Sequence, residues 1–165
     1  MRVRAQPRRG VVMVTELRNR LLRVVLGVLT LLFVLPAAAM APIEHWQTAN
    51  GARVYFVPAP ELPMVDVQVV FNAGSARDGS QPGLAQLTHV LLDKGADGLS
   101  ADVIAQRLEG VGARLSGDSL RDMALLRLRS LNDAKYLQPA VEVFARIIAK
   151  PDFNPADVDR ERERM

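Results

Sequence analysis

Residues 64–71 alternate between apolar and polar side chains, and this alternation constrains the fold more than any other feature of the chain. Val65, Val67 and Val69 share one parity of the run, whereas Asp66 belongs to the other. Because successive side chains of a β-strand point to opposite faces, the pattern predicts a strand that buries one face only. Such a strand needs a second layer over its apolar side, so a sheet packed against other elements is expected.

The remaining residues separate into predicted strands and predicted helices. Two short apolar runs flank Asn50–Gly51, a dipeptide that favours the tight turn of a β-hairpin. Two further strands are predicted within residues 113–131, joined by a turn around Gly117–Asp118. Helices are predicted over residues 83–95, 99–113 and 133–150, and from Pro155 onwards. Ser100 is the expected N-cap of the second helix, and the third begins at about Asp133 and contains Pro139, which favours a kink. This order predicts an α+β fold, a largely antiparallel sheet with helices packed on one face. Because the sequence ends inside a charged predicted helix, the domain is expected to be incomplete at its C-terminus.

Residues 1–39 are predicted to be a secretory signal peptide. An arginine-rich start is followed by the apolar stretch Val24–Leu35 and by a run of small residues, with cleavage expected after Ala39. The apolar stretch is shorter than the ~20 residues of a membrane-spanning helix. A start at Met13 and an uncleaved membrane anchor are the alternatives. In either case residues 40–165 are expected to be exported, into the periplasm, with the membrane contacted only through the leader.

The formal charge of +3 is located in the leader. Residues 1–41 hold seven arginines and one glutamate, which gives +6, so the remaining 14 basic and 17 acidic residues give −3. A slightly acidic folded part is not expected to bind nucleic acid. The chain has no cysteine, so its core rather than disulfides must stabilise it.

The segment around the predicted helix 83–95 resembles a known family. The run NAGSARDGSQPGLAQLTHVLLDKG, followed by GARLSGDSLRDMALLRLRSL, is similar to the N-terminal domain of the pitrilysin/insulinase peptidases. These are zinc peptidases with an inverted H-x-x-E-H motif on a helix that opens G-L-A-H and closes with K-G. Here Gly83-Leu84-Ala85 and Lys94-Gly95 fall in register. The resemblance covers residues 40–165 and implies a partial pitrilysin-like domain.

The catalytic motif itself is absent from this frame. The resemblance places the first ligand histidine at Gln86, the general base at His89 and the second ligand histidine at Val90, and it places the third ligand, a glutamate, just beyond Met165. A catalytic Zn²⁺ needs three protein ligands and an open water position. An amide is a poor zinc ligand and an isopropyl group is none, so no zinc and no activated water are expected in this chain.

Weaker candidate sites remain. His89 and Asp93 share a predicted helix face with Gln86 and are candidates for a weak metal site, but the favoured interpretation is the polar side of a helix that buries Leu84, Leu87, Leu91 and Leu92. His45 has no spacing relation to His89. Arg127 and Arg129 are candidates for contact with an acidic peptide, against a plain solvent face. Solvated charge is the favoured interpretation of Glu61, Asp66, Asp78 and the mixed-sign run from Asp159 to Arg164.

The resemblance implies a function in a pair. Such domains enclose a chamber together with a similar partner, and one partner often lacks the motif. The leading hypothesis is a non-catalytic subunit or domain that assists a motif-bearing, zinc-binding partner in periplasmic peptide degradation. The alternatives are an active zinc metalloendopeptidase with ligands outside this segment, and a peptide-binding or scaffolding module in which the strand Met64–Phe71, if at a sheet edge, adds a peptide strand.

Overall fold

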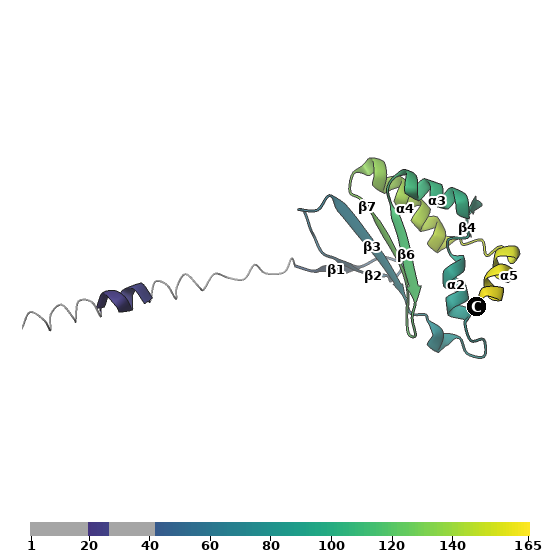
Figure 1. The fold of residues 1–165 in the computed structure, drawn as a ribbon, viewed down its shortest axis with the longest axis horizontal. Coiled ribbons are helices and arrows are strands. Elements are labelled where there is room, and N and C mark those ends of the chain that lie inside the picture. Colours follow the sequence, from purple (N-terminus) through teal and green to yellow (C-terminus); the bar gives the residue numbers. More distant parts are fainter. Residues whose placement is uncertain (1–19, 27–41) are drawn as a thin grey trace, which may run out of the picture. The chain divides into compact units, whose positions relative to one another are not determined.

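The computed structural model describes residues 20–26 and 42–165 of the chain (Figure 1). It divides into two compact units, Met1–Ala59 and Pro60–Met165, which are treated separately below. Apart from a short helix over residues 20–26, the predicted signal peptide lies outside the described residues, as does its expected cleavage site. Within the described ranges, no helix has both the length and the apolar character needed to cross a membrane.

The first unit contains the predicted hairpin. Strand β1 (Glu44–Gln47) pairs antiparallel with β2 (Arg53–Phe56), with Gln47 opposite Arg53. Gly51 turns the chain with a positive φ of 89°, which glycine adopts at little cost. His45 stacks against Tyr55 within the hairpin, their ring centroids 6.3 Å apart. The Asn-Gly signal therefore predicted this element correctly.

The second unit is a three-stranded antiparallel sheet covered by helices. The strand order is β3 (Met64–Phe71), β7 (Ala124–Leu131), β6 (Arg114–Ser119), so β3 is an edge strand of this sheet. The helices that Figure 1 shows gathered on one side of the sheet are α2 (Leu84–Leu91), α3 (Ala101–Gly110), α4 (Ala134–Ala149) and α5 (Pro155–Arg164). The predicted α+β architecture is confirmed.

The core lies between the sheet and helices α3 and α4. The alternation along β3 places Val65, Val67 and Val69 inward and Asp66 outward, as predicted. The fully buried side chains at the centre are Leu128 of β7, Ile104 of α3 and Ile147 of α4. Each such side chain contributes about 1.5–3 kcal/mol of burial free energy. Helix α4 continues through Pro139 without interruption, because the burial of its apolar face outweighs the one backbone hydrogen bond that proline removes.

Two predicted boundaries are wrong. The turn between β6 and β7 lies at residues 120–123, where the Leu120 amide donates to the Met123 carbonyl over 2.8 Å, and Gly117 is inside β6. Helix α2 ends at Leu91, after which β4 (Gly95–Ala96) pairs with β5 (Leu99–Ser100). The two residues between these strands, Asp97 and Gly98, have φ values of 51° and 77°, the type I′ geometry that Asp-Gly favours.

Candidate functional site

Helix α2, on which the sequence resemblance places the motif positions, is anchored at its N-terminus by a carboxylate from the preceding loop. A single 3₁₀ turn, η1 (Ser75–Arg77), leads to Asp78, whose Oδ2 accepts from the Gly83 amide over 2.8 Å and whose Oδ1 accepts from the Ala85 amide over 2.9 Å. Asp78 is only 9% exposed. It satisfies two free amides and places a negative charge at the positive end of the helix. The interpretation of Asp78 as solvated charge is therefore wrong.

Removing this cap should loosen α2. Asp78→Ala is expected to lower the free energy of unfolding by about 1–2 kcal/mol, because two partly buried amides lose their acceptor. Asp78→Asn keeps one oxygen acceptor and is expected to lose less. Chemical unfolding followed by circular dichroism measures both values, and equal losses in the two variants would contradict a capping role.

His89 lies between α2 and the sheet. Its Cε1 is 2.6 Å from the position that a Cβ on Gly117 would occupy, so the ring packs against β6 where that strand has no side chain. Its Nδ1 is buried without a hydrogen-bond partner in the described structure. His89 was interpreted as part of the polar side of this helix, but its ring packs against the sheet. Leu84, predicted to be buried, is 45% exposed, while Leu91 is buried as expected.

The described residues do not assemble a metal site at the family's positions. Gln86 is exposed, Val90 is half-buried and offers no donor atom, and Asp93 is exposed and pairs with Lys94 over 3.1 Å. Nowhere in the described ranges do three His, Cys, Asp or Glu side chains come close enough together to hold an ion. Because zinc requires three such ligands, these residues do not fit the family's zinc ion, and the candidate pair His89 and Asp93 gains no further ligand.

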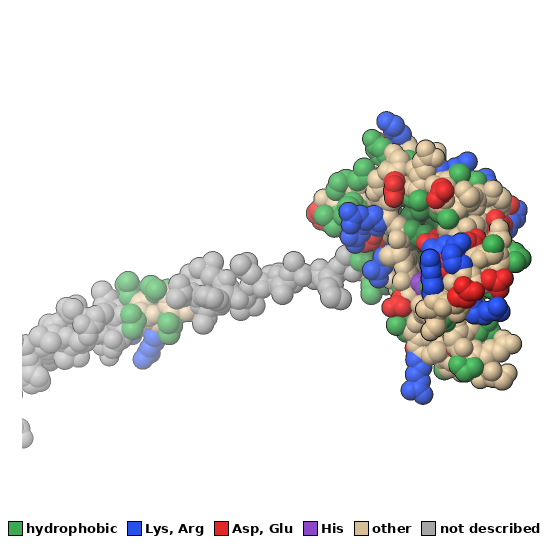
Figure 2. Space-filling model, turned by 45° about the vertical axis from the view of Figure 1, so that its right-hand side comes forward, with side chains coloured by type: hydrophobic (Ala, Val, Ile, Leu, Met, Phe, Trp, Pro, Cys, Tyr) green, Lys and Arg blue, Asp and Glu red, His purple; other side chains and the backbone are tan. Residues whose placement is uncertain are grey.

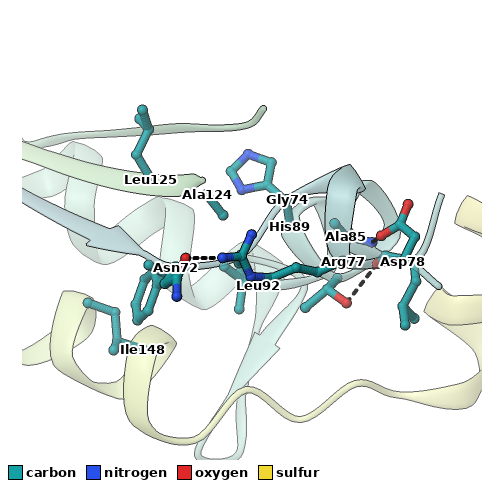
Figure 3. A pocket seen from close by; sticks show the side chains of 14 residues that line it. Asn72, Gly74, Arg77, Asp78, Ala85, His89, Leu92, Ala124, Leu125 and Ile148 are labelled. Carbon is teal, nitrogen blue, oxygen red and sulfur yellow. Dashed lines mark hydrogen bonds between the residues drawn. The ribbon is translucent and has the colours of Figure 1, made fainter. Parts of the chain in front are cut away.

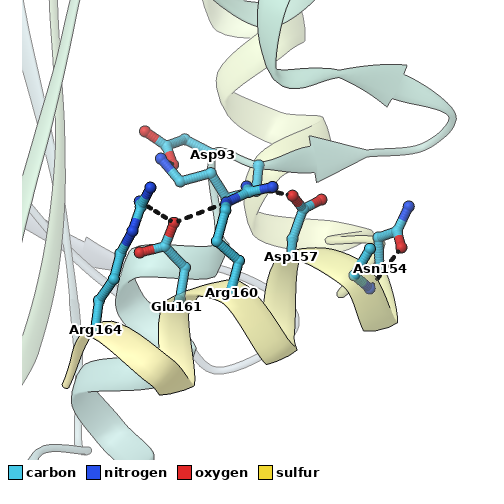
Figure 4. A network of polar contacts seen from close by, with 8 residues as sticks. Asp93, Asn154, Asp157, Arg160, Glu161 and Arg164 are labelled. Atoms are coloured by element: carbon cyan, nitrogen blue, oxygen red, sulfur yellow. Dashed lines mark hydrogen bonds and ion pairs between the residues drawn. The ribbon is translucent and has the colours of Figure 1, made fainter.

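Helix α5 packs against α2 and carries two shielded carboxylates. The methyl group of Met165 reaches to 3.0 Å from the Cβ position of Gly83, at the start of α2. The Glu161 side chain is 12% exposed and pairs with Arg164 over 3.1 Å and with Arg160 over 3.6 Å. Arg160 also pairs with Asp157, and Figure 4 shows this network on the side of α5 turned toward Asp93. The run from Asp159 to Arg164 is therefore not a uniformly solvated surface.

Glu161 is a candidate that sequence reasoning missed. The family's third ligand was placed beyond Met165, yet the described chain already presents this glutamate from a helix packed on α2. Two guanidinium groups contact its Oε1, and the two positions at which the resemblance places ligand histidines hold Gln86 and Val90 here. The sequence of α5 already contains acidic and basic residues at i, i+3 spacing, which predicts ion pairs along the helix. Which of its acidic side chains is shielded from solvent depends on the packing of α5 against α2.

A largely apolar cavity of about 410 Å³ opens beside α2 (Figure 3). It lies among the end of β3, the loop with η1, helix α2, the start of β7 and the end of α4. Phe71, Leu84 and Ile148 form apolar walls, and His89 contributes the imidazole. Arg77 on the wall donates to the Asn72 side chain. This volume accommodates an amino-acid-sized apolar group.

The two arginines predicted to contact peptides are on the opposite face of the sheet. In β7 the inward side chains are those of Leu126 and Leu128, so Arg127 and Arg129 point away from α2 and the helices. Arg129 forms a two-pronged ion pair with Asp66 of β3, both distances being 2.7 Å. That contact holds the pKa of the Asp66 carboxyl below its ordinary value. The α2 residues and these arginines therefore do not form one site.

Comparison with known proteins decides the family. The family model described as insulinase (peptidase family M16) matches residues 53–165. The chain belongs to this family. The pitrilysin/insulinase resemblance of the sequence is thereby confirmed. None of the curated proteins compared with the chain matches it.

Two solved structures place this insulinase-family chain within larger proteins. The peptidase M16 inactive domain from Pseudomonas fluorescens is 41% identical, with a TM-score of 0.73, over 74% of this chain and 30% of that one. A protease from Helicobacter pylori is 19% identical, with a TM-score of 0.67, over 74% of this chain and 29% of that one, and supports the fold alone. The chain thus spans under a third of the length of either structure.

Proposed function

We propose that this chain acts as a non-catalytic insulinase-family domain, exported to the periplasm, that pairs with a zinc-bearing member of the family in peptide degradation. The observation that carries the proposal is a family frame whose two ligand-histidine positions hold Gln86 and Val90. The similar structure from Pseudomonas fluorescens is itself described as an inactive domain, which supports the same assignment.

The loss of zinc chemistry follows from the ligands. Without a metal, bound water keeps a pKa of ~15.7 instead of ~7, and no hydroxide nucleophile is available at neutral pH. His89 occupies the position of the general base but packs against the sheet at Gly117. The Glu161 carboxylate, on the helix that packs against α2, is paired with Arg160 and Arg164. The zinc, the water and the base are therefore assigned to the partner.

The contribution of this chain is a surface for peptides and for the partner. The apolar cavity beside α2 is of a size to receive a side chain. The predicted signal peptide supports a periplasmic location, where peptides rather than folded cytoplasmic proteins would be the substrates. In this arrangement the chain shapes the chamber and the partner cleaves.

Purification of the full-length protein from its native periplasm tests the pairing. A second insulinase-family subunit with an intact H-x-x-E-H motif is expected to co-purify, and peptide hydrolysis is expected to need both. Changing the motif glutamate of the partner to glutamine should abolish peptide hydrolysis by the complex. His89→Ala in this chain should not abolish it, because the catalytic groups are assigned to the partner. Recovery without any second family member, or hydrolysis by this protein alone, would count against the proposal.

A peptide-binding or scaffolding role is a second candidate, favoured by one observation. Strand β3 is at the edge of the described sheet of residues 60–165, so its outer backbone groups are available for pairing with an extended peptide within that sheet. Binding of peptides by the purified protein, with no cleavage even after the motif-bearing peptidase is added, would support this role over the paired peptidase.

A further inference from the structure

The outer face of the sheet carries a cross-strand arrangement of arginines that the candidate site does not use. Arg129 of β7 lies opposite Asp66 of β3 on one side and opposite Arg114 of β6 on the other. One step along β7, Arg127 lies between Gln68 of β3 and Ser116 of β6. All these side chains are exposed, and they point away from the helices.

One of the three arginines is neutralised. The Asp66 carboxylate binds Arg129 through both of its oxygens, at 2.7 Å each. Arg127 donates from its Nε to the uncharged Gln68 Oε1 over 3.2 Å, so it keeps its charge. Neither Arg127 nor Arg114 forms an ion pair with any acidic side chain in residues 42–165. Two guanidinium groups without an ion pair therefore share this face with two carboxylates, that of Asp66, bound to Arg129, and that of Asp118 in β6, which forms no ion pair within residues 42–165.

The three arginines face two carboxylates, Asp66 and Asp118, so this face keeps a formal charge of +1 (three minus two), and Asp118 lies at the far end of β6 from Arg114. Arg114 and Arg129 are direct cross-strand neighbours, whose Cβ atoms in antiparallel sheets are about 5 Å apart, and like charges at such positions repel. Arg127 is the diagonal neighbour of Arg114, at about 7–8 Å. A carboxylate bound between Arg114 and Arg127 would reduce the repulsion among the arginines. The planar guanidinium group, with its parallel N–H donors, matches the two oxygens of a carboxylate. The bond to Gln68 orients Arg127 before any ligand arrives.

The surroundings indicate which acidic ligand fits. Exposed apolar side chains border the charged rows: Met64 pairs with Leu131 at one end, and Val70, 53% exposed, lies at the other. The face drawn in Figure 2 shows basic and acidic side chains interleaved rather than a broad field of one sign. Two free cations are too few to hold a polyanion such as a nucleic acid, whose binding neutralises many phosphates. A peptide with an acidic residue between apolar ones matches both the charge and the borders.

We propose that Arg114 and Arg127 form a carboxylate subsite that selects peptides carrying an acidic residue flanked by apolar residues. The inference rests on the proposed function in that it takes peptides as the ligand class. It assigns a specificity to this chain rather than to its zinc-bearing partner, through side chains that take no part in cleavage.

Binding of matched peptides to the full-length protein tests the subsite. The probes are two extended fluorescent peptides of identical apolar sequence, one with a central glutamate and one with a central glutamine. The acidic peptide is expected to bind about tenfold more tightly, and this preference should be lost in the double variant Arg114→Gln, Arg127→Gln. The preference should also weaken as the salt concentration rises.

A matched control separates the subsite from net charge. Arg107→Gln removes one exposed positive charge from α3 and is expected to leave the preference intact. Thermal unfolding gives a second readout, because the acidic peptide should raise the Tm of the unmodified protein but not of the double variant. Equal affinity for the two peptides, or loss of the preference in Arg107→Gln, would overturn the subsite. Co-purification with the partner is measured separately, so the pairing stands or fails independently.

Discussion

Replacing Gly74 by alanine is expected to lower the free energy of unfolding of residues 60–165 by about 2–6 kcal/mol. Gly74 has φ 104° and ψ 172°, a conformation that is essentially restricted to glycine and costs other residues about 1–3 kcal/mol. A Cβ there would lie 2.4 Å from the Leu120 carbonyl oxygen and 2.8 Å from the Met123 nitrogen. These are backbone atoms that cannot turn aside, and the overlap adds about 1–3 kcal/mol.

The contact at Gly74 joins the loop before α2 to the turn between β6 and β7. The amides of Ser75 and Ala76 donate to the carbonyls of Leu120 and Arg121 over 3.0 and 2.7 Å, so the loop cannot move away without losing both bonds. Gly79 is the matched control, because it also has a positive φ, 58°, but nothing lies within 4 Å of its Cβ position. Gly79→Ala is expected to cost only about 1 kcal/mol. Chemical unfolding curves that give equal losses for the two variants would refute the close approach.

The second large effect is expected at Gly117, where the sheet meets α2. A Cβ on Gly117 would lie 2.5 Å from the Leu125 carbonyl oxygen and 2.6 Å from the His89 ring. Gly117→Ala is therefore expected to lower the free energy of unfolding by about 2–4 kcal/mol, since both β7 and α2 must shift. Gly110→Ala serves as the control, because its Cβ position is open and alanine favours the helix there, giving a change between zero and a gain of about 1 kcal/mol.

A double-mutant cycle assigns part of that loss to the imidazole. In the His89→Ala background the ring no longer blocks the Cβ, whereas the Leu125 carbonyl still does. Gly117→Ala should therefore cost at least about 1 kcal/mol less in that background than in the unmodified protein. Strictly additive losses in the unfolding experiment would mean that His89 does not lie against β6.

These contacts hold α2 in place through side chains of the described residues. Asp78 caps α2, His89 fills the space left by Gly117, and α5 packs along its side. None of the three uses a zinc ligand. The contacts that support this part of the insulinase-family frame are therefore independent of metal binding, which is what the proposed non-catalytic role requires.

The sequence predicted what local pattern determines. The valine alternation of β3, the hairpin at Asn50–Gly51, the N-cap Ser100 and the start of a helix near Asp133 all depend on neighbours within a few residues, and all are present. The Asp-Gly turn between β4 and β5 carried a comparable signal that was overlooked. Periodicity and turn chemistry therefore account for most of the element order.

The site depended on contacts between distant residues, which local pattern does not encode. Gly117 was interpreted as a turn residue, but its lack of a side chain serves His89, 28 positions earlier. In the sequence, Glu161 cannot be distinguished from the other charged residues of α5. Its low exposure results from the packing of α5 against α2. That Val90 cannot bind a metal ion could be inferred from the sequence, because the valine side chain has no donor atom in any conformation.

The zinc content of the full-length purified protein tests the central claim most directly. We expect well under one zinc ion per chain by elemental analysis after dialysis against free metal, unchanged by His89→Ala, and no peptide hydrolysis by the protein alone. One tightly held zinc per chain that is lost in His89→Ala, together with hydrolysis in the absence of any partner, would contradict the account.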